Sequence, residues 1–233
     1  MSKGRLFLIP GFLGNFDSSL MSPHSLEIIH ALDEFIVENE KPARAVLKAS
    51  GTPIHQNDFT FHLMGKHSDP ADYASYLRSC KNGKDVGLLS DAGLPCVADP
   101  GFEIVRLAHK NEIEVVPLIG MSSIMLTLMA SGFNGQSFKF HGYLPHDEQR
   151  KKKILKQAAS DVKRNETQIF IETPYRNGAF IKTLQNHFQT DALLCVGVDI
   201  TMETQSVVTR QLKDWTQHAS ELHKRPAVFI LGL

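Results

Sequence analysis

Two apolar runs that end in small-residue turns constrain the fold more than any other feature of the sequence. The run Val86 to Leu89 ends in Ser90-Asp91-Ala92-Gly93, and the run Val115 to Leu118 ends in Gly120-Met121-Ser122-Ser123. Each run is short, apolar throughout and bounded by a turn, so both are predicted to be buried strands. A segment with helical spacing of apolar residues follows each turn. In open α/β sheets, ligands bind beyond the carboxyl ends of such strands. The two turns therefore predict a small-molecule site built largely from backbone.

The rest of the chain continues the alternation of strands and helices. Ser22 and Asp99 are expected to cap helices that begin at Pro23 and Pro100. A further helix is expected to begin at Asp69 and to end near residue 82. The predicted strands cover residues 5–9, 35–37, 86–89, 115–118, 138–143, 169–172, 193–199, 203–210 and 227–232. The apolar spacing of the two capped helices covers residues 25–32 and 104–108, and the remaining predicted helices cover residues 41–49, 124–130, 150–163 and 180–188.

The pattern of elements changes after Gly132, which is predicted to end a helix. Before it, strands alternate with helices, which favours a mostly parallel sheet. After it, several strands follow one another more closely, which favours a smaller and more antiparallel sheet. The predicted fold class is α/β, with an N-terminal α/β domain over residues 1–132 and a C-terminal α/β domain with a mixed sheet over residues 133–233.

Composition limits the classes of partner. Lys plus Arg and Asp plus Glu each number 25, so the formal net charge is zero and any contact with nucleic acid needs a local basic patch. Cys80, Cys96 and Cys195 lack metal-ligand spacing, so neither a zinc site nor a disulfide framework is expected. No apolar run reaches the length of a signal peptide core or a membrane span. A cytoplasmic location without membrane contact is therefore expected.

The turn Ser90-Asp91-Ala92-Gly93 places a carboxylate and a hydroxyl beside small residues that allow close backbone approach. Its carboxylate can accept hydrogen bonds from an amine or from ribose hydroxyls. The alternative is a structural turn in which Asp91 caps the turn and Gly93 supplies a positive φ. Ser122 has the same two interpretations, because it either caps the following helix or exposes amides to a ligand. Neither turn is a dinucleotide fingerprint or a Walker loop, which disfavours a dinucleotide or ATP.

The segment SDAGLPCVADPGFEIVRLAHKNEIEVVPLIGMSS, which begins at Ser90, resembles the central signature of the tetrapyrrole methylase superfamily. The likeness continues through residues 130–132, through Gly142-Tyr143-Leu144-Pro145 and through residues 170–176, FIETPYR. Within the superfamily the chain is most similar to the group that methylates ribose 2'-hydroxyls of 16S rRNA. The resemblance implies two αβα domains, S-adenosylmethionine bound in the cleft between them, and a homodimer.

The resemblance also implies which residues hold the cofactor. They are Pro10, Ser90, Asp91, Ala92, Gly93, Val97, Gly120, Met121, Ser122, Glu172, Thr173 and Pro174. Two runs depart from the pattern of the rRNA group. Residues 9–16 read IPGFLGNF where the group carries ATPIGNL, and residues 37–41 read VENEK where it carries AEDTR. Glu38 and the downstream Arg44 match the group, whereas Asn39 replaces its aspartate.

Methyl transfer to a ribose hydroxyl requires that the hydroxyl lose its proton, and a nearby carboxylate can accept it. Glu38 is the first candidate for this catalytic role and Glu40 the second, and the alternative for each is a solvated or capping side chain. The predicted RNA-binding residues are Arg44, Arg150, Lys151 and Lys152, with Lys153, Lys156 and Arg164 on the same basic segment. The alternative for this segment is a solvated helix face. No histidine has metal-ligand spacing, so no metal is expected.

The aromatic segment around Phe59, Phe61 and His62 precedes a polar loop, Gly65 to Asp69. These side chains are expected either to shape a substrate mouth or to pack in the core.

The leading functional hypothesis is an S-adenosylmethionine-dependent methyltransferase that acts on a ribose hydroxyl in small-subunit rRNA. A second hypothesis is methylation of a tetrapyrrole or another small molecule. A third is a catalytically weak, cofactor-binding factor for RNA assembly. A tetrapyrrole enzyme needs a wide apolar trough, whereas an RNA enzyme needs basic residues around its cleft.

Overall fold

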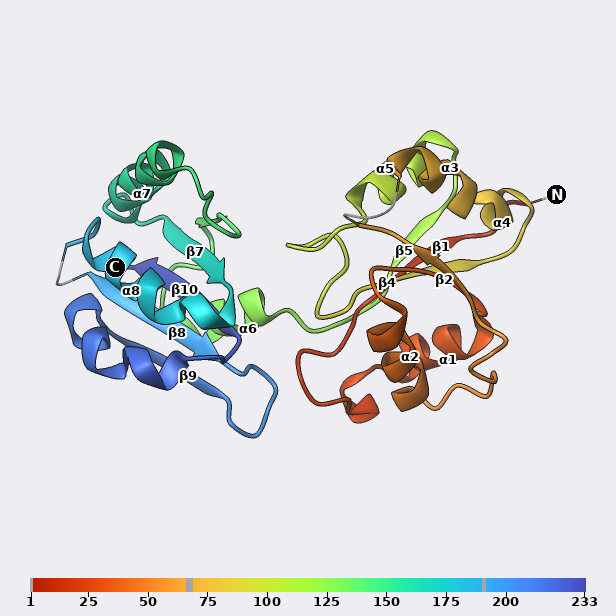
Figure 1. Ribbon diagram of the computed structural model, residues 1–233, viewed down its shortest axis with the longest axis horizontal. Coiled ribbons are helices and arrows are strands. Elements are labelled where there is room, and N and C mark those ends of the chain that lie inside the picture. The colour runs from red at the N-terminus through yellow and green to blue at the C-terminus, as the bar shows by residue number, and fades with distance from the viewer. Residues whose placement is uncertain (1, 66–68, 190–191) are drawn as a thin grey trace. The chain divides into compact units, whose positions relative to one another are not determined.

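The computed structural model describes residues 2–65, 69–189 and 192–233, and the chain folds into two compact units (Figure 1). The first unit comprises residues 1–122 and the second comprises residues 123–233. Each unit is built around its own five-stranded sheet, with helices on both faces. In the described part of the chain, no helix is long and apolar enough to cross a membrane.

The sheet of the first unit is entirely parallel and has the strand order β3-β2-β4-β1-β5. The strands are β1 (Leu6–Ile9), β2 (Glu34–Val37), β3 (Thr60–Leu63), β4 (Val86–Leu89) and β5 (Val115–Pro117). Because all five strands run the same way, the loops that follow them leave the sheet at one edge. This arrangement confirms the mostly parallel N-terminal sheet that the sequence predicts.

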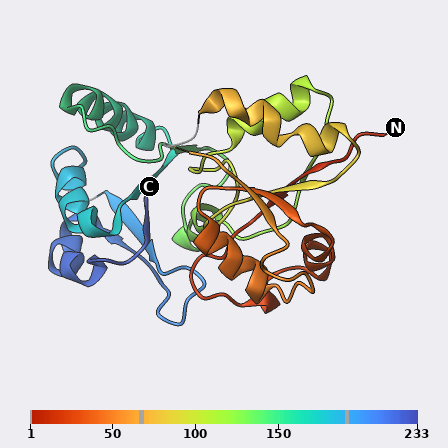
Figure 2. The ribbon, with the colours of Figure 1, turned by 45° about the vertical axis from the view of Figure 1, so that its right-hand side comes forward.

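Helices cover both faces of this sheet, as Figures 1 and 2 show. α1 (Pro23–Ala31) and α2 (Glu40–Ala49) lie on one face, and α3 (Tyr73–Tyr76), α4 (Arg78–Lys81) and α5 (Phe102–Lys110) lie on the other. Neighbouring strand residues alternate between the two cores: Phe35 packs with the α1 and α2 side, whereas Ile36 packs with the α3 and α5 side. Ser22 caps α1 through a 3.0 Å bond from the Ser25 amide, with Pro23 at the first helical position, as predicted.

Two predicted helix starts in the first unit need correction. Asp69 caps only a short 3-10 helix, Pro70–Asp72, and the predicted single helix is broken there and again at Leu77 between α3 and α4. Asp99 does not cap α5, because Gly101 with a φ of 117° precedes that helix and the Asp99 carboxylate is directed to Ser90.

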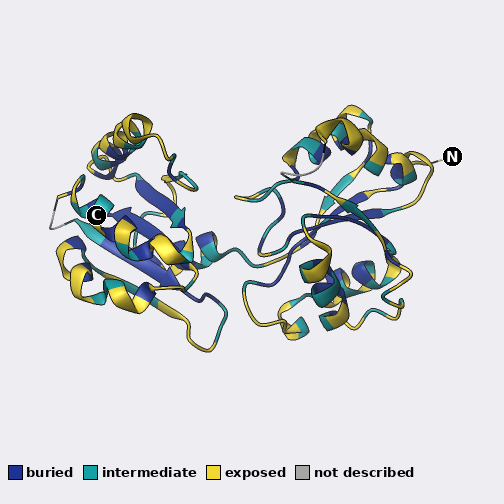
Figure 3. Cartoon of the chain, viewed as in Figure 1, coloured by how far each residue is buried: buried dark blue, intermediate teal, exposed yellow. Residues whose placement is uncertain are grey.

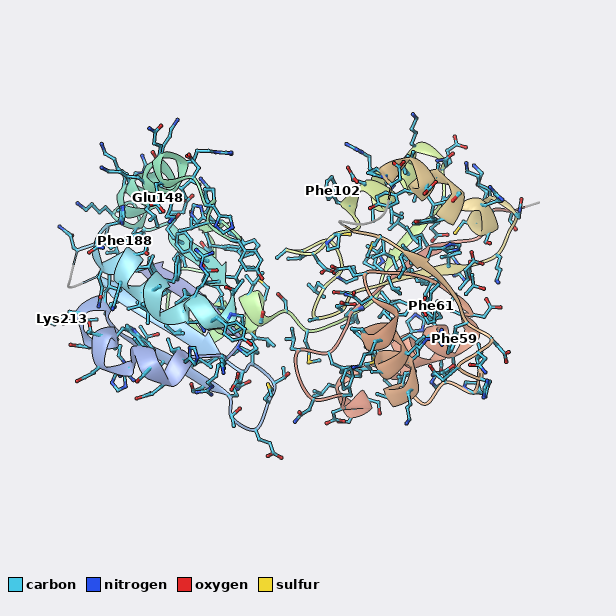
Figure 4. All side chains as sticks on the ribbon, viewed as in Figure 1. Phe59, Phe61, Phe102, Glu148, Phe188 and Lys213 are labelled. Atoms are coloured by element: carbon cyan, nitrogen blue, oxygen red, sulfur yellow. The ribbon has the colours of Figure 1, made fainter. Side chains whose placement is uncertain are left out.

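The segment around Phe59 and Phe61 supplies β3 and core side chains. The Phe35 and Phe59 rings meet edge to face with centroids 5.6 Å apart, and Phe61 packs partly buried against the same core (both are labelled in Figure 4). His62 stacks on Tyr76 and its Nε2 lies 2.9 Å from the Glu34 carboxylate. These contacts favour the core-packing interpretation. Residues 66–68 of the polar loop lie outside the described residues.

The sheet of the second unit is mixed, with the order β6-β7-β10-β8-β9. The strands are β6 (Phe138–Phe140), β7 (Thr167–Glu172), β8 (Leu193–Val198), β9 (Ser206–Gln211) and β10 (Ala227–Gly232). Only β6 and β7 pair in parallel, and the other neighbours are antiparallel. The predicted mixed C-terminal sheet is therefore confirmed.

One face of this sheet is covered by α6 (Ser123–Ser131) and the other by α7 (Glu148–Val162), α8 (Asn177–Gln185) and a 3-10 helix, Leu212–Leu222. Two short 3-10 helices, Ser18–Leu20 and Pro174–Arg176, complete the secondary structure of the described residues. Figure 3 shows that the central strands of both sheets are mostly buried, whereas the edge strands β3, β5, β6 and β9 and the outer surfaces of the helices are more exposed.

The boundary between the units falls before α6 and not at Gly132, where the sequence places it. Ile124 and Leu128 of α6 pack with Ile169, Val228 and Ile230 of the second sheet. This tertiary contact joins α6 to the second unit. Gly132 nevertheless follows α6 directly with a φ of 80°, as expected for a glycine that ends a helix.

Candidate active site

Three loops of the first unit meet at the carboxyl edge of its sheet. The Gly11 amide donates to the Gly93 carbonyl at 2.9 Å, and the Gly93 amide donates to the Gly11 carbonyl at 3.2 Å. A Cβ on Gly11 would lie 2.3 Å from the Ser90 carbonyl oxygen, and a Cβ on Gly120 would lie 2.1 Å from the Pro10 ring. Only glycine permits such close approach. The loops after β1, β4 and β5 are therefore packed together by backbone.

The strand register also brings residues 38 and 39 to this edge. Val37 of β2 pairs with Leu89 of β4, so Glu38 and Asn39 follow directly beside Ser90 and Asp91. The Asn39 side-chain amide donates to Asp91 Oδ2 at 2.6 Å. The structure thus places Glu38, one of the two predicted catalytic carboxylates, next to the predicted cofactor turn.

Ser90 is fully buried, and its side chain bonds only to other groups of the protein in the described contacts. Its Oγ lies 2.8 Å from Asp99 Oδ2 and 3.0 Å from the Ala92 carbonyl oxygen. The hydroxyl proton therefore serves these two acceptors, and both polar backbone groups of Gly93 are bonded to Gly11. Within the predicted turn, Ser90 and Gly93 hold the loop in shape. Asp91 and Ala92 are the two residues of the turn that are partly or fully exposed.

Glu38 and Asp99 form a hydrogen-bonded carboxyl pair behind this turn. Burial, the hydrogen bond with Asp99, and the charges of Asp99 and Asp91 raise the pKa of Glu38 to about 8. Burial and the charge of Asp91 also raise the pKa of Asp99, although its bonds to Glu38 and Ser90 act in the opposite direction. Two carboxyl groups in contact cannot both be ionised at low cost. The pair therefore holds one proton at neutral pH.

The loop from Gly93 to Gly101 returns Asp99 to Ser90 through several left-handed residues. Cys96 and Ala98 have φ values of 65° and 60°, and such backbone costs a non-glycine residue roughly 1–2 kcal/mol each. Gly93 has the same conformation without a Cβ, with a φ of 70°. The positive φ expected for Gly93 is therefore present. The bond between Asp99 and Ser90 closes this loop against the sheet edge.

Several predicted cofactor residues lie exposed or partly exposed at this edge. Val97 is 44% exposed, and Ala92 and Gly120 are also exposed. Met121 is half-buried against the core on the α1 and α2 side, whereas Pro10 is buried under Gly120. Ser122 is half-buried and lies next in the chain to α6.

The predicted cofactor residues of the second unit follow β7. The Glu172 carboxylate accepts bonds from the amide and hydroxyl of its neighbour Thr173, at 2.7 and 3.3 Å, and lies 3.4 Å from Arg176. Thr173 is exposed, and Pro174 begins the 3-10 helix that leads into α8. Glu172 thus shapes the turn, and Thr173 is its exposed polar residue.

The second catalytic candidate and one predicted RNA contact are bonded to each other. Arg44 pairs with Glu40 at 3.1 Å, also donates to the Gln56 carbonyl, and lies over the Phe61 ring with its guanidinium carbon 4.6 Å from the centroid. The Arg44 guanidinium therefore has its contacts with α2 and with the segments packed beside that helix. Glu40 is exposed and lies apart from the hydrogen bonds that join Glu38, Asp99 and Ser90.

The other predicted basic residues lie on α7, which follows an Asp147 cap that accepts a bond from the Arg150 amide three residues later. Arg150 and Lys152 are exposed. Lys151 is only 16% exposed and pairs with Glu148 at 2.6 Å. Among the described residues, no group of three or more His, Cys, Asp or Glu side chains could hold a metal ion.

Sequence reasoning missed the role of Asp99 and the contact between Asn39 and Asp91. Asp99 precedes a proline, a pattern typical of a helix cap, and only the tertiary fold reveals its partners. In the sequence, Asn39 stands out only because the rRNA group carries an aspartate at this position. Next to Asp91, an aspartate at this position would add a second negative charge, whereas an asparagine donates a hydrogen bond.

Residues 13–216 match the model of the tetrapyrrole (corrin/porphyrin) methylases, a span that includes the turn after β4, the loop after β5 and the turn after β7. The chain belongs to this family. Membership makes it a methyltransferase that uses S-adenosylmethionine as methyl donor.

Similar curated proteins carry the name ribosomal RNA small subunit methyltransferase I. The protein from Pseudomonas aeruginosa is 28% identical over 100% of this chain and 80% of its own length. The protein from Bacillus subtilis is 33% identical over 74% of this chain and 56% of its own, and that from Escherichia coli O157:H7 is 29% identical over 75% and 58%. The matches with the latter two proteins thus span somewhat more than half of their lengths.

Solved structures share the fold. The methyltransferase CobJ aligns with a TM-score of 0.68 at 16% identity, over 98% of this chain and 94% of its own. A uroporphyrin-III C-methyltransferase from Thermus thermophilus, complexed with S-adenosyl homocysteine, aligns with a TM-score of 0.64 at 17% identity, over 98% and 97%. At these identities the likeness establishes the fold of the two units.

The residues at the carboxyl edge of the first sheet fit an adenosyl cofactor. Asp91 retains acceptor capacity for ribose hydroxyls, because only its Oδ2 is engaged by Asn39 in the described contacts. Ala92 and Val97 offer small and apolar exposed surface, and the glycine contacts hold the three loops close together. A carboxylate beside small apolar surface suits the ribose and base of an adenosyl group.

Proposed function

We propose that this protein transfers the methyl group of S-adenosylmethionine to a ribose 2'-hydroxyl in small-subunit rRNA. The observation that carries the proposal is the position of Glu38, which the pairing of Val37 with Leu89 sets beside the cofactor turn. Burial there raises the pKa of this proton acceptor to about 8. The similarity to proteins named as small-subunit rRNA methyltransferases, over the whole chain in one case, supports the choice of RNA.

Asp91, Ala92, Val97, Gly120 and Met121 would hold the cofactor at the edge of the first sheet. The bound cofactor supplies an electrophilic methyl group on a good leaving group. Positioning therefore contributes much of the rate. The buried residues Pro10, Ser90 and Gly93 would keep the loops in place, and Glu172, Thr173 and Pro174 would contribute the turn after β7.

Glu38 would accept the proton of the attacking hydroxyl. As a carboxylate it can accept this proton, and a base is most effective when its pKa lies near the working pH. Asp99 would act as a positioning residue, because it contacts Glu38 and Ser90 at the same time. The proton that the pair already holds near neutral pH must leave before Glu38 can act.

We further propose that the protein is cytoplasmic and forms a homodimer, in keeping with an rRNA substrate and with the family resemblance. Exposed apolar side chains on α6 support an association surface, since Met125 is 40% and Met129 80% exposed.

Transfer of a tritiated methyl group tests the function. Small-subunit rRNA from a strain that lacks the corresponding gene would be incubated with the protein and labelled S-adenosylmethionine, and the labelled nucleotide would then be mapped. We expect label on one ribose. Absence of label from every RNA fraction, or label only in an added tetrapyrrole, would overturn the proposal.

Substitution of Glu38 tests the assigned base. Glu38→Gln keeps the shape and the hydrogen bond to Asp99 but cannot accept the proton, so kcat should fall by about 10²–10⁴-fold. Glu27→Gln is the matched control, because Glu27 is exposed on α1. Equal kcat values for the two variants at saturating substrate would remove Glu38 from the mechanism.

A further inference from the structure

A groove of about 340 Å³ lies in the second unit between α7 and the end of α8. Lys156, Ser160 and Lys163 line it from the α7 side, and His187 and Gln189 line it from the segment after α8. Its apolar lining consists of Ala159, Val162, Phe188, Ala192 and Leu233 (Phe188 is labelled in Figure 4). The groove therefore combines one cationic wall with an apolar lining.

Three lysines form one stripe beside this groove. Lys152 and Lys156 of α7 and Lys163, its C-cap residue, are exposed. Lys163 keeps helical backbone angles, so the spacing of four and seven residues places the three on one side of the helix. The rise of an α-helix separates them by about 6 Å and about 10 Å along the axis. We call these three residues the lysine stripe.

Two basic residues next to the lysine stripe are held in ion pairs, whereas in the described contacts the stripe is not. Lys151 is bonded to Glu148, and Arg164 is bonded to Asp161. No lysine of the stripe forms an ion pair with any residue that the structure describes. Because the whole chain has a formal net charge of zero, this stripe is a local concentration of positive charge.

The groove lies at the opposite end of the second sheet from the turn after β7. Leu231 near the end of β10 pairs with Gln168 near the start of β7, and Leu193 next to Ala192 pairs with Gly232. The lining residues Ala192 and Leu233 thus lie near the amino end of β7, whereas Glu172 lies at its carboxyl end. The six residues of β7 separate the two ends by about 17 Å.

The polar groups of the groove suit a nucleotide. His187 Nδ1 lies 2.8 Å from the Thr183 carbonyl oxygen, which can only accept, so Nδ1 carries a proton and a neutral ring leaves Nε2 as an acceptor. Ser160 and Gln189 add groups that donate and accept. An unpaired base presents both kinds of partner and an apolar face, and phosphates pair with lysine.

We propose that the lysine stripe and this groove form an anchoring site for single-stranded RNA, separate from the turn after β7. This inference rests on the proposed function and specifies where part of the RNA substrate is held. The stripe contacts successive phosphates, and the groove receives an unpaired base. An anchor far from the reacting group contributes to substrate binding without changing the chemical step.

The test removes the three positive charges. The variant Lys152→Gln, Lys156→Gln, Lys163→Gln would be compared with Lys48→Gln, Lys110→Gln, Lys213→Gln, which loses the same charge from exposed lysines elsewhere (Lys213 is labelled in Figure 4). Binding of protein-free small-subunit rRNA would be measured from 50 to 200 mM salt, together with kcat and KM for methyl transfer. Thermal melting would check that both variants are folded.

We expect the stripe variant to raise KM about tenfold or more, with kcat unchanged. The slope of log affinity against log salt should become less steep by about 2, because each lost phosphate contact on a single strand removes about 0.7. The control variant should keep most of the wild-type affinity and slope.

Equal KM values and salt slopes for the two variants would overturn the anchoring site while leaving the proposed function intact. A fall in kcat alone would also overturn it. Wild-type protein that neither binds nor methylates the rRNA would overturn both this inference and the proposed function.

Discussion

Glu38 and Asp99 determine how the candidate site responds to pH. Glu38 follows β2, and Asp99 lies in the loop after β4. Burial raises the pKa of both carboxyl groups, and their contact raises the pKa of Glu38 further but lowers that of Asp99. A carboxyl with its ordinary pKa of 4.5 would be ionised throughout the neutral range, whereas Glu38 ionises at about pH 8. The activity and the stability of the protein should therefore change with pH in opposite directions.

Activity should rise with pH through about 8, because Glu38 accepts a proton only after it has lost its own. The measurement is kcat/KM for rRNA methylation between pH 6 and pH 10. Asn39→Asp should move this rise to higher pH, since a carboxylate would replace the amide that donates to Asp91 at 2.6 Å. A profile that falls through pH 8 would show that the protonated form of Glu38 is the active one.

Stability should fall as pH rises. A folded-state pKa above the ordinary value means that the proton is bound more tightly in the folded protein than in the unfolded chain. The contribution of this proton to the free energy of unfolding is therefore complete below pH 4.5 and is lost as the pH rises through 8. Glu38→Gln removes this dependence. Because Glu38 is only partly buried, we expect the variant to gain about 1 kcal/mol, or roughly 2–4 °C in melting temperature, relative to wild type between pH 6 and pH 9.

Differential scanning calorimetry at several pH values measures this effect, with Glu27→Gln as the control. A constant difference in melting temperature between Glu38→Gln and wild type at every pH would contradict the assigned pKa.

At the scale of elements, the candidate site depends on loops that approach one another by backbone. Gly11 and Gly93 bond to each other, and Gly120 lies against the Pro10 ring. The parallel sheet brings the loops after β1, β4 and β5 to one edge, and the glycines allow them to touch. Changes in this packing should affect cofactor binding as well as stability.

Gly11→Ala should destabilise the protein by about 1–3 kcal/mol, because its Cβ would lie 2.3 Å from the Ser90 carbonyl oxygen and the loops must separate. Cofactor affinity, measured by calorimetry with S-adenosyl homocysteine, should fall at least tenfold. Gly135→Ala is the control, since a Cβ there has no atom within 4 Å. Unchanged affinity in Gly11→Ala would show that the contact does not shape the cofactor site.

At the scale of the whole molecule, two compact units are joined through Ser122 and Ser123. α6 belongs to the second unit because Ile124 and Leu128 pack against its sheet. The exposed apolar residues Met125 and Met129 lie on the same helix. Burial of such side chains in a partner would favour the proposed homodimer.

Multi-angle light scattering tests the homodimer. We expect a mass of about 52 kDa, twice the 26.0 kDa of one chain, at micromolar concentration. Met129→Glu should weaken the association if α6 takes part in it, because a charge replaces an exposed apolar side chain. A mass of 26 kDa for the wild type at every concentration would contradict the homodimer.

Local sequence patterns determined most of the secondary structure. The cap at Ser22, the glycine after α6 and the small-residue turns after β4 and β5 act within a few residues, so the sequence alone reveals them. The parallel first sheet also follows from the alternation of strands and helices. The sequence does not predict β3, and it predicts one helix where the segment between Asp69 and Lys81 is broken, since four-residue elements carry little periodicity.

The sequence by itself determined that each of the two turns joins a strand to a helix in consecutive βα units and that a family of methyltransferases shares the turns. Only the tertiary structure decided which polar groups meet there. Asp99 reaches Ser90 across nine residues, and Asn39 reaches Asp91 across 52. Such partners depend on strand order and register, which sequence spacing does not encode. The same reason explains why α6 joins the second unit and why the lysine stripe borders a groove.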